Sequence, residues 1–242
     1  MALQSISIGT TANDGTGTNL REAFDICNDN FTEVYSSGTA ALAYKLEGTN
    51  FTGSLLVGHS TTGTISSAEY NTGIGISTLD ALTSGDRNVA VGALAGTNIS
   101  SGGSNTLVGS NAGDALTTGS HNIAIGHNAL GAEDGNGRNV AIGYQALLVQ
   151  NAGADAYNIA IGYNTGVAVS TGIRNIIIGA EAGDALTTGD YNVAIGHEAL
   201  STEDAHGRNV AIGYRALRDM DAGTDAYSVA IGYLAGENIT TG

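Results

Sequence analysis

The motif Asn139-Val140-Ala141-Ile142-Gly143 (NVAIG) is the best guide to the fold of this 242-residue chain, because close copies of it recur at almost fixed spacing. Within it two branched side chains alternate with a small one, which is the period-2 pattern of a β-strand. The glycines that close the copies follow one another in steps of 17 or 19, at Gly75, Gly92, Gly109, Gly126, Gly143, Gly162, Gly179, Gly196, Gly213 and Gly232. This regularity is typical of a repeat protein and not of a compact enzyme.

A longer period is superimposed on the short one. Three steps of 17 and one of 19 add up to a period of 70, and the segment GDALTTG at 113–119 returns at 183–189. Duplication of a block of four coils is the simplest explanation. Because so short a unit has room for only two or three short strands, we expect a mainly β fold. Its core is a parallel β-solenoid, or β-roll, of about ten 17- or 19-residue coils over residues 71–242.

Polar and glycine columns accompany the predicted strands. Stacked coils would align the residue before each strand into a buried amide ladder, in which every amide donates and accepts. These residues are Asn71, Asn88, Asn105, Asn122, Asn139, Asn158, Asn175, Asn192 and Asn209, with Ser228 in the tenth place. Three positions earlier, residue types that tolerate positive φ predict a left-handed turn at Gly85, Gly102, Gly119, Asn136, Asp155, Gly172, Gly189, His206 and Asp225.

The alanine at the centre of most predicted strands indicates a face that another backbone approaches closely, so we expect both faces of the strands to be buried. Side-by-side packing of identical chains would bury the second face, and a homotrimer is the usual closed form for rods. A further apolar column predicts a second strand in each coil, through Leu82, Ile99, Leu116, Val169, Leu186 and Ile239.

Glu133 and Glu203 interrupt this column, and we expect their loops to bulge into solvent.

The first 38 residues have a different character. Asn19 and Glu22 form a capping box, and Gly38 is placed to end the helix, so we expect an amphipathic helix over 19–36. A two-heptad apolar seam favours trimerisation through this helix, although packing on its own chain remains an alternative. The seam consists of Leu20, Phe24, Cys27, Phe31 and Val34. We therefore divide the chain into an attachment module (1–38), a connector and capping region (39–70) and the repeats (71–242).

Two resemblances follow from these motifs. The units NVAIGYQAL, NIAIGYNTG and NVAIGHEAL resemble the head repeats of trimeric autotransporter adhesins, which implies a trimer of left-handed parallel β-rolls that attaches to surfaces. The segment at 7–35, SIGTTANDGTGTNLREAFDICNDNFTEVY, resembles an N-terminal module of tail-fibre and baseplate-associated proteins of tailed bacteriophages. That second resemblance implies attachment to a phage tail, a baseplate or another fibre protein.

Composition restricts the partners of the chain. With 23 acidic and 8 basic side chains and a net charge of -15, the chain lacks the Lys/Arg cluster that would bind nucleic acid through its phosphates. No run approaches the roughly 20 apolar residues of a membrane span, and the first residues lack the pattern of a signal peptide. We expect no nucleic-acid binding, no membrane insertion, synthesis in the host cytoplasm and a final location in the virion.

We expect no catalytic site, no metal site and no cofactor, because no chemical motif stands apart from the repeat. The acid spacing in AGDALTTGD does not match calcium-binding β-roll motifs. Three copies of His127 or His197 on a threefold axis could bind a metal, but surface or packed histidines are far commoner. Tyrosines that follow the strand glycines either stack as a stabilising ladder or are surface contacts for sugars: Tyr144, Tyr163, Tyr214 and Tyr233.

Together these observations predict a homotrimeric tail fibre or related virion appendage, a rod that joins the phage tail to a surface contacting a host receptor or glycan. The alternative is the head of a bacterial trimeric surface adhesin. A polysaccharide-degrading β-solenoid is a third interpretation, but it would need clustered acids that break the repeat.

Overall fold

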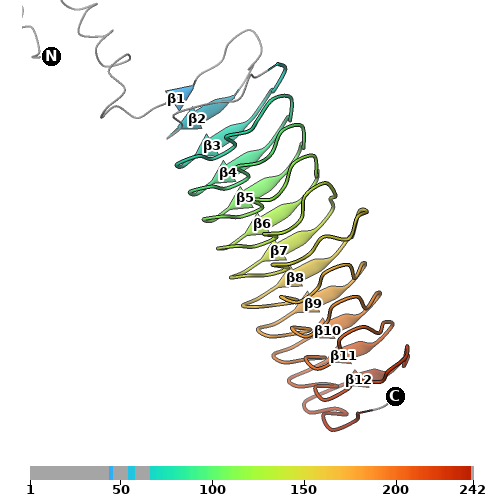
Figure 1. The fold of residues 1–242 in the computed structure, drawn as a ribbon. Coiled ribbons are helices and arrows are strands. Elements are labelled where there is room, and N and C mark those ends of the chain that lie inside the picture. The colour runs from blue at the N-terminus through green and yellow to red at the C-terminus, as the bar shows by residue number, and fades with distance from the viewer. Residues whose placement is uncertain (1–43, 46–53, 58–65, 241–242) are drawn as a thin grey trace, which may run out of the picture. The chain divides into compact units, whose positions relative to one another are not determined.

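The computed structural model describes residues 44–45, 54–57 and 66–240, all within one structural unit, Tyr44–Gly242. The predicted helix 19–36 and its seam lie outside these residues. Within the described part, Figure 1 shows strands β1 (Tyr44–Lys45), β2 (Leu55–Val57), β3 (Thr72–Ile74), β4 (Val89–Val91), β5 (Thr106–Val108), β6 (Ile123–Ile125), β7 (Val140–Ile142), β8 (Ile159–Ile161), β9 (Ile176–Ile178), β10 (Val193–Ile195), β11 (Val210–Ile212) and β12 (Val229–Ile231).

Strands β2 to β12 are parallel and pair in sequence order, so the sheet grows by one strand per coil. The register is kept across the longer coils, since Ala141 of β7 still pairs with Ala160 of β8. Strand β1 pairs antiparallel with β2, and both come from the segment that we expected to be a connector and cap. The described residues confirm the prediction of a parallel β-solenoid of about ten coils (Figure 1).

The prediction of a second strand in each coil is wrong. Each coil has one short strand, and the rest of the coil is built of turns. The side chains of Leu82, Ile99 and Leu116 are fully buried as a core column, but their backbone N–H groups donate to carbonyls three positions earlier in the same coil. A backbone that turns back on itself in this way cannot continue a ladder between strands.

Within the single chain only one face of the strands is buried, and it is the alanine face. The central alanines point into the interior of their own coil and are fully buried in all but the last strand, as are Leu107 and Ile177 in the same column. The flanking valines and isoleucines point outward and are at least partly exposed. Alanine occupies the inner column because it faces the large leucines and isoleucines of the core column across a narrow interior.

The left-handed residues lie elsewhere than predicted. The residue immediately before each asparagine of the ladder has φ between 54° and 65°, whereas Gly85 and its equivalents do not have positive φ. Gly85 is required for a different reason, since a Cβ atom there would lie 2.2 Å from the carbonyl oxygen of Gly102 in the next coil. Close stacking of backbones therefore favours glycine without a special dihedral angle in five of the nine coils, whereas Asn136, Asp155, His206 and Asp225 occupy the position in the other four.

The glutamates of the core column do not bulge into solvent. Glu133 and Glu203 are fully buried, in the places that Leu116 and Leu186 occupy one coil earlier. In each of the longer coils the two extra residues come after the core column, within 151–157 and 221–227, where several side chains are exposed. An insertion on the outside leaves the inner columns in register, because only the surface loop has to lengthen.

Candidate functional site

An apolar strip covers the outer face of the sheet. It consists of the first and third residues of strands β2 to β12, and apart from Thr72 and Thr106 every one is Leu, Val or Ile. Exposed fractions include 45% for Ile74, 39% for Val89 and 67% for Ile231. A parallel sheet normally has both faces covered, and a solvated face would carry polar side chains. The apolar strip therefore has the composition of a buried surface.

The asparagine ladder runs beside the apolar strip, inside the coils. From Asn88 onward, the backbone N–H of each ladder residue donates to the side-chain Oδ1 of the ladder residue one coil earlier, as from Asn175 to Asn158 at 2.8 Å. The Nδ2 groups mostly donate to a backbone carbonyl of the next coil, for example from Asn175 to Gly189 at 2.8 Å. All nine asparagines are fully buried, so these amides satisfy backbone groups that water cannot reach.

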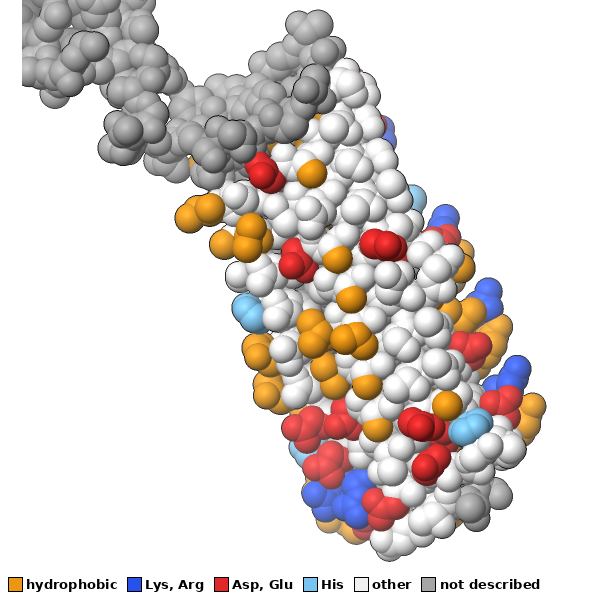
Figure 2. Space-filling model, viewed as in Figure 1, with side chains coloured by type: hydrophobic (Ala, Val, Ile, Leu, Met, Phe, Trp, Pro, Cys, Tyr) orange, Lys and Arg blue, Asp and Glu red, His pale blue; other side chains and the backbone are white. Residues whose placement is uncertain are grey.

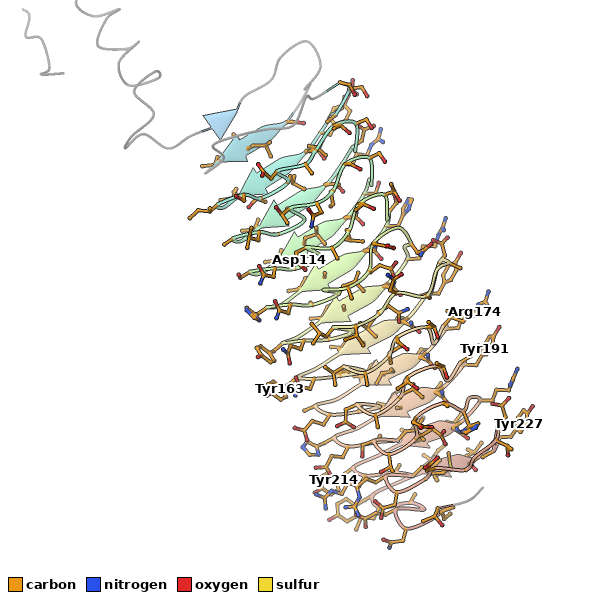
Figure 3. The ribbon with its side chains drawn as sticks, in the orientation of Figure 1. Asp114, Tyr163, Arg174, Tyr191, Tyr214 and Tyr227 are labelled. Carbon is orange, nitrogen blue, oxygen red and sulfur yellow. The ribbon has the colours of Figure 1, made fainter. Side chains whose placement is uncertain are left out.

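An Arg–Tyr column forms one edge of the sheet, immediately before the ladder asparagines. Six successive coils alternate arginine with tyrosine, and the guanidinium carbons lie 5.4 to 5.9 Å from the neighbouring ring centroids. Arg174 also donates to the Tyr191 hydroxyl at 2.6 Å, and Figure 3 shows both on the same edge as Tyr227. The members are Arg138, Tyr157, Arg174, Tyr191, Arg208 and Tyr227. Because cations cover the ring faces, this column serves first to tie neighbouring coils together.

A His–Tyr column forms the other edge, where Figure 3 places Tyr163 and Tyr214. Tyr144 is stacked between His127 and Tyr163, with ring centroids 5.5 and 5.3 Å away. The second copy of the four-coil block repeats this arrangement, with Tyr214 between His197 and Tyr233 at 5.7 and 5.3 Å. Figure 2 shows histidine beside hydrophobic side chains along one edge and Arg beside them along the other.

The four tyrosines that we named as candidate surface contacts are therefore all exposed and all in register, but they differ in what they offer. Within the described part of the chain, ring stacking occupies both faces of Tyr144 and Tyr214 and only one face of Tyr163 and Tyr233. Tyr163 is followed in its column by Ala180, so its second face is open toward the next coil. A sugar ring could stack on Tyr163, but not on the two inner rings.

A buried polar layer replaces the apolar core at the junction of two coils. Glu133 accepts the backbone N–H of Asn136 at 3.1 Å through Oε1, and Gln150 accepts the Nδ2 of Asn158 at 2.7 Å. Burial raises the pKa of Glu133, against the opposing effect of the hydrogen bonds from Asn136. Among the described residues, Glu133 Oε2, Asn139 Nδ2 and Gln150 Nε2 have no hydrogen-bond partner. Such orphaned groups stabilise the fold less than leucine would.

Sequence reasoning missed this layer. Gln150 stands one short step after Glu133 and one long step before Val169, so spacing alone assigns it to the core column, but the column was traced without it. Nor did any motif indicate that Glu203, Asp204 and His206 would meet Asp221 of the following coil.

Comparison of the chain with protein-family models, curated proteins and solved structures finds no match to any of them. Among residues 44–45, 54–57 and 66–240, no helix is long and apolar enough to cross a membrane.

Proposed function

We propose that this chain is a structural and adhesive protein of a bacteriophage particle, a homotrimeric tail fibre or appendage in which three solenoids pack through their apolar strips. The observation that supports the trimeric assembly most directly is the apolar strip itself. Two columns of partly exposed, mostly branched side chains run along the coils, with no charged residue among them. Burial of such a surface stabilises an assembly by about 25 cal/mol per Å² of apolar area removed from water.

Identical copies are the occupants that suit this surface best. The apolar strip has the same repeat as the solenoid, so only another surface with the same repeat can match it over its whole length. Closed rotational symmetry lets each copy bury its strip against its neighbours, and it leaves the Arg–Tyr and His–Tyr columns at the edges. Repetition of weak contacts on three solenoids would then add up through avidity.

The native mass of the purified full chain tests the assembly. Sedimentation equilibrium should give three times 24.2 kDa. Ile125→Lys combined with Ile161→Lys places charges in the apolar strip and should yield a folded monomer, as judged by an unchanged circular dichroism spectrum. The matched control is Val149→Lys, since Val149 is 41% exposed but lies outside the strip, and it should remain trimeric. A wild-type monomer would refute the trimer.

Location in a virion needs a separate test. Antibodies raised against the purified chain should label tail appendages in immunogold electron micrographs of virions from the source culture. Labelling of uninfected bacterial surfaces in place of virions would instead favour the alternative, a bacterial trimeric adhesin head, which the resemblance of the repeats also supports. Neither result affects the test of the apolar strip, so the proposed trimer and the proposed location in a virion can be refuted independently.

A further inference from the structure

Four potential metal ligands converge near the C-terminal end of the described solenoid. Glu203, Asp204 and His206 come from one coil and Asp221 from the next, and one ligand atom of each lies within 4.8 Å of those of the others. None of the four residues belongs to the apolar strip or to either aromatic column. We expected no metal site from the sequence, because no chemical motif stands apart from the repeat.

Glu203 gives this cluster a feature that exposed acidic groups lack. Its side chain is fully buried, and its Oε1 accepts the backbone N–H of His206 at 3.0 Å and lies 3.0 Å from the His206 Nδ1. Its Oε2 is also buried but has no hydrogen-bond partner in the part of the chain that the structure describes. A buried carboxylate oxygen without a partner is costly, and a cation is one of the few groups that can satisfy it.

We propose that Glu203, Asp204, His206 and Asp221 bind one divalent cation of the zinc class. An imidazole nitrogen with three carboxylates is a donor set that suits Zn²⁺ better than Ca²⁺ or Mg²⁺, which prefer oxygen ligands alone. Four protein ligands are the number found in structural zinc sites. Bound there, the ion fastens two successive coils together, and the His206–Glu203 contact gives way to shared coordination.

Hydrogen bonds made by the backbone groups of Asp204 and Asp221 connect the ligand loops to the neighbouring coils on both sides. The Asp204 carbonyl accepts the Thr187 hydroxyl at 2.6 Å from the preceding coil. The Asp221 N–H donates to the Thr240 carbonyl at 3.1 Å in the following one. Since the two loops are fixed by these contacts, only side-chain rotation is needed to close the site around an ion, which favours binding by a largely prepared site.

The internal duplication supplies a natural comparison. In the first copy of the four-coil block the same positions are Glu133, Asp134, Asn136 and Asn151. Glu133 is buried there with the same unpartnered Oε2, but asparagines replace the imidazole and the second aspartate. The described part of the chain has no metal-ligand group at this earlier position. His206 and Asp221 therefore distinguish the proposed site from its duplicate.

A second group of potential ligands, Glu181, His197 and Glu198, is a weaker candidate. The Glu198 carboxylate is already bound by Arg215, whose Nε lies 2.6 Å from it, and this contact lowers the pKa of Glu198. None of its three side chains is fully buried. His197 nevertheless provides a useful control, because its removal should not affect the proposed site.

The test is calorimetric titration of the full chain, freed of any purification tag and of bound metal by EDTA, with ZnCl₂. The wild type should bind one equivalent tightly. His206→Asn and Asp221→Asn copy the duplicate, so both variants should fold, and each should weaken binding by about tenfold or more. His197→Asn should leave the tight equivalent unchanged. In the reverse direction, Asn136→His with Asn151→Asp should raise the stoichiometry from one to two.

Thermal unfolding supplies a second readout, because an ion that binds only the folded chain raises the midpoint with its concentration. Zn²⁺ should raise the midpoint of the wild type and of His197→Asn, but much less that of His206→Asn. The proposal is overturned if the wild type binds no Zn²⁺, or if His206→Asn and Asp221→Asn bind it as tightly as the wild type. Binding of Ca²⁺ with no effect of His206→Asn would also overturn it.

Discussion

The backbone N–H of Asn192 donates to the side-chain Oδ1 of Asn175, one coil earlier, at 2.8 Å. The same contact recurs from coil to coil along the solenoid, and the Nδ2 of Asn175 donates to the carbonyl of Gly189 in that same following coil. Each such asparagine thus links consecutive coils. Loss of its side chain should therefore weaken the junction with the following coil and not only its own coil, as in other solenoids whose coils stabilise one another.

Asn175→Ala should lower the free energy of unfolding by about 2 kcal/mol or more, because it leaves a buried N–H and a buried carbonyl without partners. Chemical denaturation followed by circular dichroism measures this change. Thr224→Ala, at an exposed loop position, should change it by less than about 0.5 kcal/mol. Equal effects of the two substitutions would show that the ladder contributes no more than a surface side chain.

Gly143→Ala should destabilise the fold by about 3 kcal/mol or more, because of both its dihedral angle and its neighbours. Gly143 has φ 135°, and a Cβ atom there would lie 2.0 Å from the carbonyl oxygen of Gly162 in the next coil. Gly153→Ala is the matched control, since Gly153 also has positive φ (69°) but nothing within 4 Å of the added atom, so only the dihedral cost of about 1 kcal/mol applies. Denaturation midpoints of Gly143→Ala and Gly153→Ala measure the two losses of stability. Similar losses would refute the role of close stacking.

Glu133→Gln should stabilise the chain in a pH-dependent way. Because burial raises the pKa of Glu133 above its usual value of 4.5, the folded state holds the proton more tightly than the unfolded chain. The protonated Glu133 carboxyl therefore makes its full contribution to the free energy of unfolding below pH 4.5, and this contribution is lost as the pH rises through the raised pKa. The variant should match the wild type near pH 4 and exceed it by about 1 to 2 kcal/mol at pH 7. If the curves of unfolding free energy against pH run parallel for Glu133→Gln and the wild type, the prediction is wrong.

Phe24→Asp combined with Phe31→Asp should leave the assembly trimeric if the apolar strip holds it together. Two heptads form only a marginal helical seam, whereas the strip extends over all the parallel strands of the described solenoid. Sedimentation of this variant beside Ile125→Lys/Ile161→Lys assigns the assembly to one element. A monomeric Phe24/Phe31 variant would place trimerisation in the residues 19–36, outside the described part of the chain.

Arg174→Ala should cost no more than about 1 kcal/mol in unfolding free energy, although it removes contacts to both Tyr157 and Tyr191. The arginine is at the surface, where water competes for the guanidinium. Thermal denaturation of this variant beside Asn175→Ala should show a clearly larger shift for the asparagine. A larger loss for Arg174→Ala would mean that the Arg–Tyr column, and not the buried ladder, dominates the contacts between coils.

Spacing and residue type were enough to predict the coil length, the position of the strand in each coil and the in-phase register. Gly143 and Gly162 show why: the same few columns recur in every coil, and the only stacking that aligns them all is a parallel solenoid. The asparagine column could also be placed correctly beside the strand, because an amide that repeats once per coil has a neighbouring amide above and below.

The direction in which each column points depends instead on how the coil closes. Val140, Ala141 and Ile142 are all apolar, so their alternation separates two faces without identifying the inner one. Closure identifies it, because the narrow interior admits alanine opposite leucine and leaves the branched residues outside. The burial of Glu203 and the proximity of Asp221 to His206 depend on how one coil stacks on the next. The order of residues in the sequence therefore could not predict either of them.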